Sequence, residues 1–238
     1  MDERMNLPVG SPLMFFLILL VPLILIMLFV NTIKSAFLGL GFSPAAATAL
    51  VFVSIAGSIV NIPIREVVKE KTTFETPTSF VYSILYPQSK GPAKRIEKTR
   101  IAVNLGGAIV PLFVCAYIFF RFPGHVLPFS LVTVPVSIAI CYRSARIMPN
   151  VGVVMPTFVP PAAAAALALV FAWGDASAIP LCYVTGVLGV IVGADLLNLD
   201  KLGSMSAPMA SIGGAGTFDG IFLTGIVSVF LGEVISFL

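Results

Sequence analysis

Long uninterrupted apolar runs are the feature of this sequence that most constrains its fold. The first runs from Leu13 to Val30 without a charged residue, and six further apolar runs follow it. About 20 apolar residues cross the hydrocarbon core of a bilayer as a helix, which satisfies all its own backbone hydrogen bonds there. The sequence therefore predicts an all-α, polytopic transmembrane helical bundle. Its seven predicted spans are residues 12–32, 44–63, 101–120, 126–142, 157–173, 178–197 and 218–238.

Composition supports the same class of protein. Of the 238 residues, 58% are apolar and 11% are charged, whereas soluble domains have about 45–50% and about 25%. A soluble enzyme is excluded, and the net charge of +3 is confined to short stretches, so nucleic acid is not expected as a partner. We expect one integral membrane domain over residues 1–238, a multi-pass protein of the cell membrane with lipids as partners. The first run lacks a small-residue cleavage site, which favours a retained anchor over a signal peptide.

The distribution of basic residues predicts the orientation. Residues 65–100 hold eight Lys or Arg and four Glu, which are 12 of the chain's 25 charges. Cytoplasmic loops are enriched in Lys and Arg, so this loop and the N-terminus are predicted to lie inside. Within the loop, residues 71–87 are rich in Thr, Phe, Val and Tyr, which is compatible with a small hairpin on the membrane surface. The alternative is a solvated basic loop that touches anionic lipid headgroups.

The cysteines give no indication of a metal or redox site. Cys115, Cys141 and Cys182 lie in or beside apolar runs, without CxxC spacing. Small buried core residues are the expected interpretation. We therefore expect neither a bound metal nor a cofactor.

Three ionisable residues lie within the predicted spans. A charged side chain inside a bilayer costs at least about 2.5–3.5 kcal/mol, so such residues tend to mark functional sites. The predicted orientation places Asp195 at the inner end of the sixth span and Asp219 at the inner start of the seventh. Both are therefore expected at nearly the same depth. Glu233 is expected near the outer surface, facing headgroups.

Two carboxylates at equal depth on successive helices can share a proton. One can then take a proton from water while the other donates to a scissile carbonyl, which is aspartic protease chemistry. Nearby glycines would let an extended substrate backbone approach. These glycines are Gly193, Gly213, Gly214, Gly216 and Gly220. Structural alternatives remain open: Asp219 at a helix N-terminus, Asp195 paired with Lys201, and glycines as helix-packing sites.

Asparagines accompany the aspartates at the predicted inner depth. Asn61 ends the second span, Asn104 opens the third, and Asn198 follows Asp195. They predict either a polar cluster that shapes the site or simple helix caps.

Three distinctive segments cover the second half of the chain: RIMPNVGVVMPTFVPP, VTGVLGVIVGADLLNL and SIGGAGTFDGIFLTGI. Through them, most of the chain resembles an uncharacterised prokaryotic family of membrane proteins, domain of unknown function 1614. That resemblance implies no particular activity.

The layout of the two aspartates is similar to that of the GxGD intramembrane aspartyl proteases, the group of presenilin, signal peptide peptidase and prepilin peptidase. In that group, one Asp lies on a helix running inward and the other on the next helix running outward. The resemblance implies that Asp195 is the first and Asp219 the second catalytic residue. This sequence departs from the pattern, since two extra residues separate Gly216 from Asp219, Ala194 precedes Asp195, and no ProAlaLeu motif follows.

Three functional hypotheses follow from these residues. The first is an intramembrane aspartyl protease that cleaves a transmembrane peptide with Asp195 and Asp219. The second is a proton- or cation-coupled transporter or channel that uses the same aspartates with Asn104, and in which residues 200–217 form a re-entrant element. The third is a membrane scaffold without catalysis.

Overall fold

The computed structural model describes residues 12–74, 92–148, 152–202 and 209–237. Contacts divide the chain into two compact units, Met1–Phe52 and Val53–Leu238, and each is described by itself. Three helical stretches are long and apolar enough to cross a membrane: Met14–Gly39, Pro123–Ser144 and Ala178–Asn198. Four shorter apolar helical stretches accompany them: Pro44–Gly57, Leu105–Arg121, Val159–Ala172 and Gly220–Ser236. The predicted helical, membrane-like character of the chain is confirmed.

The first unit consists of helix α1 (Pro12–Gly39) and most of helix α2 (Pro44–Gly57). Helix α1 continues seven residues beyond the predicted end of its span at residue 32. Ile33, Phe37 and Leu40 are buried at helical spacing, and this packing extends the helix into the segment between the first two predicted spans.

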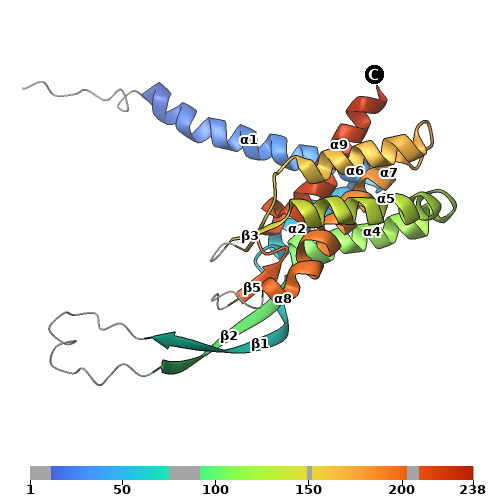
Figure 1. Cartoon of the computed structure of the whole chain (residues 1–238). Helices are drawn as coiled ribbons and strands as arrows, with labels where there is room; N and C mark the ends of the chain where they lie inside the picture. The colour runs from blue at the N-terminus through green and yellow to red at the C-terminus, as the bar shows by residue number, and fades with distance from the viewer. Residues whose placement is uncertain (1–11, 75–91, 149–151, 203–208, 238) are drawn as a thin grey trace, which may run out of the picture. The chain divides into compact units, whose positions relative to one another are not determined.

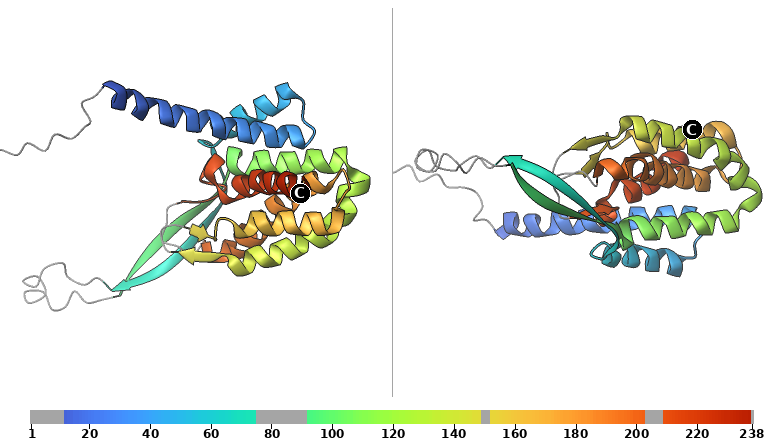
Figure 2. Two further views of the ribbon diagram at one scale, coloured as in Figure 1. Left: turned by 90° about the horizontal axis from the view of Figure 1, so that it is seen from above. Right: turned by 60° about the horizontal axis from the view of Figure 1, so that its bottom comes forward.

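The second unit has helix α7 (Ala178–Val190) at its centre. Helices α5 (Pro123–Ser144), α6 (Val159–Ala172) and α9 (Gly220–Ser236) pack against it, and α4 (Val110–Arg121) also contacts it (Figures 1 and 2). Almost every residue of α7 is buried. Its apolar sequence is therefore explained by helix–helix packing on all sides.

Helices α5 and α7 run parallel and in register. Thr133 of α5 shares a hydrogen bond with Thr185 of α7, 52 positions later. One turn further along, Ser137 lies over Gly189, which has the same sequence separation. A constant separation along two helices requires that they run in the same direction. Two successive outside-to-inside spans joined by one returning helix would have this arrangement.

A small sheet accompanies the helices. Strand β1 (Asn61–Phe74) pairs antiparallel with β2 (Pro92–Asn104), and β5 (Met209–Ile212) pairs parallel with the other edge of β2. Two short strands, β3 (Arg146–Met148) and β4 (Gly152–Val154), form a separate antiparallel pair. The β1–β2 hairpin projects from one end of the helices, next to β5 (Figure 1). These strands add a sheet to the predicted all-α bundle.

The sheet corrects the ends of two predicted spans. The span expected over 44–63 ends as helix at Gly57, and the span expected over 101–120 begins as strand, with helical structure only from residue 105. Asn61 and Asn104 are paired in the β1–β2 ladder, and Pro63 lacks the N–H that a continuing helix needs. A hairpin is present, but its strands flank the predicted segment 71–87, most of which lies outside the described residues.

Irregular helical elements lie at the hairpin end of the bundle (Figure 1). A π-helix, η2 (Leu105–Ile109), joins β2 to α4, and a second, η3 (Ile191–Asp195), ends α7. Beyond η3 come the 3₁₀ turn η4 (Leu196–Asn198), the short helix α8 (Leu199–Leu202) and, after β5, the 3₁₀ turn η5 (Gly216–Phe218). The regular helices are thus broken where the sequence places its two aspartates.

Candidate functional site

The two aspartates lie on either side of the broken connector. Asp195 is the last residue of η3, and Asp219 is the residue that precedes α9. Both are half-buried. Helix α7, which leads into η3 and Asp195, packs against α9, which begins directly after Asp219. The connector from Leu196 to Phe218 therefore returns the chain to a helix that lies beside α7.

Asp219 is the N-cap of helix α9. Its Oδ1 accepts a hydrogen bond from the backbone N–H of Ile221 at 2.9 Å, and its Oδ2 accepts one from the N–H of Ala215 at 3.4 Å. These bonds satisfy backbone donors at the start of the helix, where the helix dipole also favours a negative charge. Each carboxylate oxygen has a further lone pair, so capping leaves Asp219 able to accept another hydrogen bond.

Asp195 has a different environment. It ends a π-helical turn, a distortion that frequently occurs at functional sites. Among the side chains that the structure describes, no ion pair or hydrogen bond is made by its carboxylate. Lys201, the expected alternative partner, has its side chain outside the described part of the structure.

Asn198 closes the broken end of α7. Its Nδ2 donates to the carbonyl of Ala194 at 2.9 Å and reaches the carbonyl of Gly193 at 3.4 Å. The side chain is buried and acts as a cap for carbonyls that have lost their regular helical partners. This is the capping role that the sequence left open for Asn198.

Asn104 is the centre of a buried polar cluster. Its Nδ2 donates to the carbonyl of Ser58 at 2.8 Å and to Oδ1 of Asn61 at 3.1 Å, while its Oδ1 accepts from the N–H of Gly107 at 2.8 Å. Oδ1 of Asn61 also accepts a hydrogen bond from the hydroxyl of Ser211, at 2.5 Å. Asn104 is fully buried, so its polar groups are satisfied inside the protein. The cluster joins the end of α2, the end of the β1–β2 ladder at which Asn61 and Asn104 pair, and β5.

Glycines bring the turn before Asp219 into contact with this cluster. Gly213 and Gly216 have positive φ angles of 71° and 64°. A Cβ at Gly107 would lie 2.2 Å from the carbonyl oxygen of Gly213, and a Cβ at Gly216 would lie 2.2 Å from Cβ of Ser58. Neither contact leaves room for a side chain. The chain's own atoms therefore occupy the space beside Gly213 and Gly216 that a substrate would need.

The remaining predicted glycines differ in their surroundings. A Cβ at Gly193 would lie 2.5 Å from the carbonyl oxygen of Ile138 on α5, so Gly193 is a helix-packing position. A Cβ at Gly214 would lie 2.9 Å from Cβ of Ser211. At Gly220 the nearest atom is Cε of Met155 at 3.9 Å. Of the predicted glycines, Gly220 has the most open surroundings.

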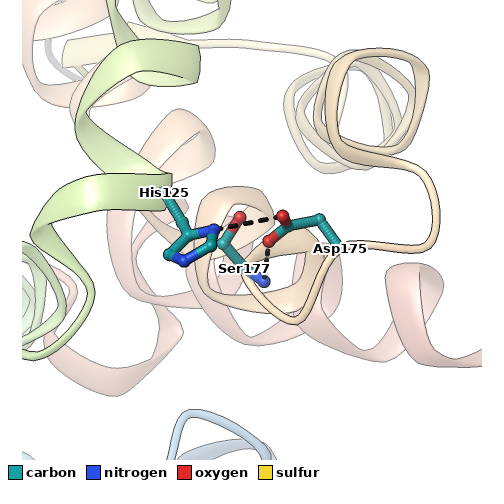
Figure 3. A network of polar contacts seen from close by, with 3 residues as sticks. All are labelled: His125, Asp175 and Ser177. Carbon is teal, nitrogen blue, oxygen red and sulfur yellow. Dashed lines mark hydrogen bonds and ion pairs between the residues drawn. The ribbon is translucent and has the colours of Figure 1, made fainter.

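A second polar group joins the starts of α5 and α7 (Figure 3). Nδ1 of His125 lies 3.1 Å from Oδ2 of Asp175, and the backbone N–H of Ser177 donates to Oδ1 of Asp175 at 2.7 Å. The nearby Ser177 hydroxyl, the Ser177 N–H and then His125 together lower the pKa of Asp175. This group was not singled out in the sequence analysis.

The three cysteines are free and buried, as expected of core residues. Within the described residues, no group of three or more His, Cys, Asp or Glu side chains is arranged to hold a metal ion.

The fold is that of a helical, membrane-like protein with a small sheet, in which an aspartate stands at each end of the connector between α7 with its π-helical extension and α9. The chain belongs to the DUF1614 family, described as proteins of unknown function, whose family model matches residues 55–231. The match covers both aspartates, Asn104 and Ser58. No curated protein and no solved structure matches the chain.

Sequence reasoning missed three residues of the cluster: Ser58, Ser211 and Thr217. Each is a small hydroxyl residue within two positions of a glycine, a combination that also occurs throughout packed membrane helices. The only available signal was the equal predicted depth of Asn61 and Asn104. Nothing in the sequence pairs Ser58 with a residue more than 150 positions later.

Proposed function

We propose that this protein is an intramembrane aspartyl protease in which Asp195 and Asp219 form the catalytic pair. The observation that carries the proposal is the placement of two half-buried carboxyl groups, one at the end of the π-helical turn that follows α7 and one at the start of α9, on two helices that pack against each other. Two carboxylates that repel each other in a poorly solvated site share one proton, and this is the state that aspartic protease chemistry uses.

The surroundings of the two residues favour different roles. Asp219 accepts two backbone N–H bonds, which favour its ionised form, so Asp219 is the base that takes a proton from the attacking water. Asp195 holds the shared proton and donates it to the oxygen of the scissile carbonyl. Attack gives a tetrahedral diol. Its collapse breaks the C–N bond: a proton passes from Asp219 to the leaving amine, and the Asp195 carboxylate takes a proton back from one diol hydroxyl. A new carboxyl group and a new amine are formed, and both aspartates return to their starting states.

Strand β5 supports an extended peptide as substrate. It is the last strand in the order β1-β2-β5, so one of its edges is unpaired among the described strands. Extended peptides bind to such edges through main-chain hydrogen bonds. Because β5 ends seven residues before Asp219, a peptide paired with it would pass close to the carboxyl groups. A membrane-spanning segment that unwinds near the surface is a substrate of this kind.

Cleavage of membrane peptides tests the proposal. The full chain is reconstituted into liposomes with a panel of fluorogenic single-span peptides, and Asp195→Asn and Asp219→Asn are compared with wild type. Asp200→Asn is the matched control, because Asp200 is an exposed carboxylate in the same connector. We expect each dyad variant to abolish cleavage and the control to retain it. Cleavage that survives both dyad substitutions contradicts the proposal, as does a wild-type chain that neither cleaves any peptide nor binds a statine-containing transition-state analogue.

A second candidate function is proton- or cation-coupled transport through the same aspartates. The observation that favours it is the break in α7 at η3, since broken helices with free carbonyls form ion sites in transporters. Liposomes that enclose a pH-sensitive dye test it. Flux driven by an imposed gradient and lost in Asp195→Asn would support transport, and its absence in wild type would exclude proton coupling.

We further infer that the shorter helices also cross the membrane, with the N-terminus inside the cell, so that the protein is multi-pass. The parallel register of α5 and α7 supports this alternation. A membrane-impermeant maleimide should label Trp173→Cys on intact cells and Arg143→Cys only after permeabilisation, since both native side chains are exposed. The reverse pattern would contradict the orientation, and labelling of both on intact cells would contradict the crossing count.

A further inference from the structure

We infer that Ser58, at the end of α2, is a positioning residue for Asp219, and that its hydroxyl sets where the second carboxylate stands relative to Asp195. The inference rests on the proposed protease function. It concerns a residue that lies 161 positions before Asp219 in the chain.

The hydroxyl of Ser58 is held in one orientation. It donates to the carbonyl of Ser54 at 2.7 Å, one helical turn earlier. Because the proton is used in that bond, the oxygen's lone pairs are left to accept, and the backbone N–H of Thr217 donates to it at 3.0 Å. Ser58 therefore holds the turn η5 by one hydrogen bond, which the backbone N–H of Thr217 donates.

The turn also rests directly on Ser58. Gly216 has a φ of 64°, and its ideal Cβ position lies 2.2 Å from Cβ of Ser58. Only glycine permits this approach, and the contact leaves the turn no room to move towards α2. The backbone N–H of Asp219 in turn donates to the carbonyl of Gly216 at 3.0 Å. A displacement of the turn is thus transmitted to Asp219 through one short hydrogen bond.

The other end of the same segment is anchored separately. Ser211 of β5 bonds to Asn61, which is held by the fully buried Asn104. Between these two anchors, residues 211–217 reverse direction through two glycines with positive φ. The Asn104 anchor fixes the strand, and the Ser58 anchor fixes the turn next to the carboxylate. Loss of Ser58 should therefore affect Asp219 more than β5.

Positioning has a characteristic kinetic consequence. A displacement of about 1 Å at a reacting group can lower the rate about 100-fold, while substrate binding elsewhere is unchanged. Removal of the Ser58 hydroxyl should therefore lower kcat by about tenfold or more and leave KM nearly unchanged. A merely structural role would reduce the amount of folded protein without changing kcat per folded molecule.

The test uses two variants that break the same hydrogen bond from opposite sides. Ser58→Ala removes the acceptor, and Thr217→Pro removes the donor N–H. Ser236→Ala is the control, because the Ser236 hydroxyl bonds to Gly232 at the far end of α9. Cleavage of the liposome peptide panel gives kcat and KM for each full-length, folded variant. If both variants act through one bond, the double variant should be no slower than the slower single variant.

A second readout does not depend on catalysis. In a chain carrying Asp195→Cys and Asp219→Cys, a short bifunctional thiosulfonate cross-links the two positions at a rate set by their separation. Adding Ser58→Ala should lower that rate at least about threefold, whereas Ser236→Ala should not change it. Native cysteines are buried and react slowly.

The outcomes separate this inference from the proposed function. Unchanged kcat and unchanged cross-linking in Ser58→Ala overturn the positioning role, even if the chain is a protease. If Ser58→Ala slows cross-linking of the double-cysteine chain while the wild-type chain cleaves no peptide, positioning is supported and the protease function is contradicted. Equal losses in Ser58→Ala and Ser236→Ala would show a general effect of hydroxyl removal and would overturn the inference.

Discussion

The hydroxyls of Thr133 and Thr185 share a hydrogen bond of 2.8 Å between α5 and α7, and both side chains are completely buried. The two hydroxyls are hydrogen-bond partners in the interior of the bundle. The pair fixes the register of the two parallel helices, one of which ends at Asp195. The site is therefore coupled to packing well inside the helical core.

Thr133→Val should destabilise the protein by leaving the Thr185 hydroxyl without its partner. Interhelical hydrogen bonds in membranes contribute about 0.6 kcal/mol on average and up to about 1.7 kcal/mol. The double variant Thr133→Val/Thr185→Val should be less destabilised than the sum of the single variants, because no orphaned hydroxyl remains. Reversible unfolding in mixed micelles measures the coupling, and strictly additive effects would contradict the shared bond.

Gly189→Ala should destabilise the α5–α7 contact. The new Cβ would lie 2.1 Å from Oγ of Ser137, and such overpacking costs about 1–3 kcal/mol. Gly124→Ala is the matched control on α5, since nothing lies within 4 Å of its Cβ position. Adding Ser137→Gly to Gly189→Ala should restore stability in the same unfolding assay. A Gly189→Ala chain as stable as the control would refute the close approach of the helices.

Asp219→Ala should lower the stability of α9 by about 0.5–2 kcal/mol, because the N-cap oxygen that accepts from Ile221 is lost. Asp219→Asn should cost little, since asparagine caps nearly as well as aspartate. Hydrogen exchange at the amides of the first turn of α9 distinguishes the two. Catalysis should instead be lost equally in both variants. An active Asp219→Asn chain would show that Asp219 acts only as a helix cap.

Asn104→Ala should be among the most destabilising substitutions at the site. It removes three hydrogen bonds made by a fully buried side chain, and each buried group left unpaired costs about 1–3 kcal/mol. Asn104→Asp keeps the acceptor for Gly107 but loses both donated bonds. It should therefore show a substantial part of the destabilisation caused by Asn104→Ala. Thermal unfolding, followed with a probe in the β1–β2 hairpin, checks whether Asn104→Ala is less stable than Asn104→Asp. An Asn104→Ala chain as stable as wild type would contradict the stabilising role of the cluster.

Asp175 should titrate below its ordinary pKa of 3.8, because Ser177 and then His125 stabilise its ionised form. A lowered folded-state pKa means that the contribution to stability is present above about pH 4 and is lost as the pH falls through the folded-state value. Asp175→Asn should remove this acid-dependent part. His125→Gln should retain most of the shift, because Ser177 contributes more. Carboxyl-selective NMR titration measures the midpoint, and a normal value in wild type would contradict the network.

The helices could be predicted from the sequence because hydrocarbon imposes a simple requirement on the backbone. All seven predicted spans agree with helical segments to within three residues at one or both ends, for example 126–142 with Pro123–Ser144 and 178–197 with Ala178–Asn198. A long apolar run has few alternatives to a helix in a bilayer. Two predicted ends failed near Gly57 and Asn104, where strand pairing replaced the helix, and a third failed at residue 32, where α1 continues to Gly39.

The candidate site was predictable in outline only. Buried charge is costly in a membrane, so Asp195 and Asp219 could be identified from their positions in apolar runs. The role of the glycines around them could not be assigned, because the space beside a glycine can admit either a substrate backbone or a closely packed helix. At Gly193, Gly213 and Gly216, the structure places the chain's own atoms in that space.

By itself, the sequence determined that this chain is a helical membrane protein and that two carboxylates stand at the ends of successive apolar segments. Both conclusions rest on local physics: the hydrophobic effect and the cost of an ion in hydrocarbon. Only the tertiary structure decided that Ser58 is hydrogen-bonded to the turn before Asp219 and that Asn104 joins α2, the hairpin and β5. Hydrogen bonds between residues more than 40 positions apart leave no periodic trace in a sequence, because their partners meet only after the helices have packed.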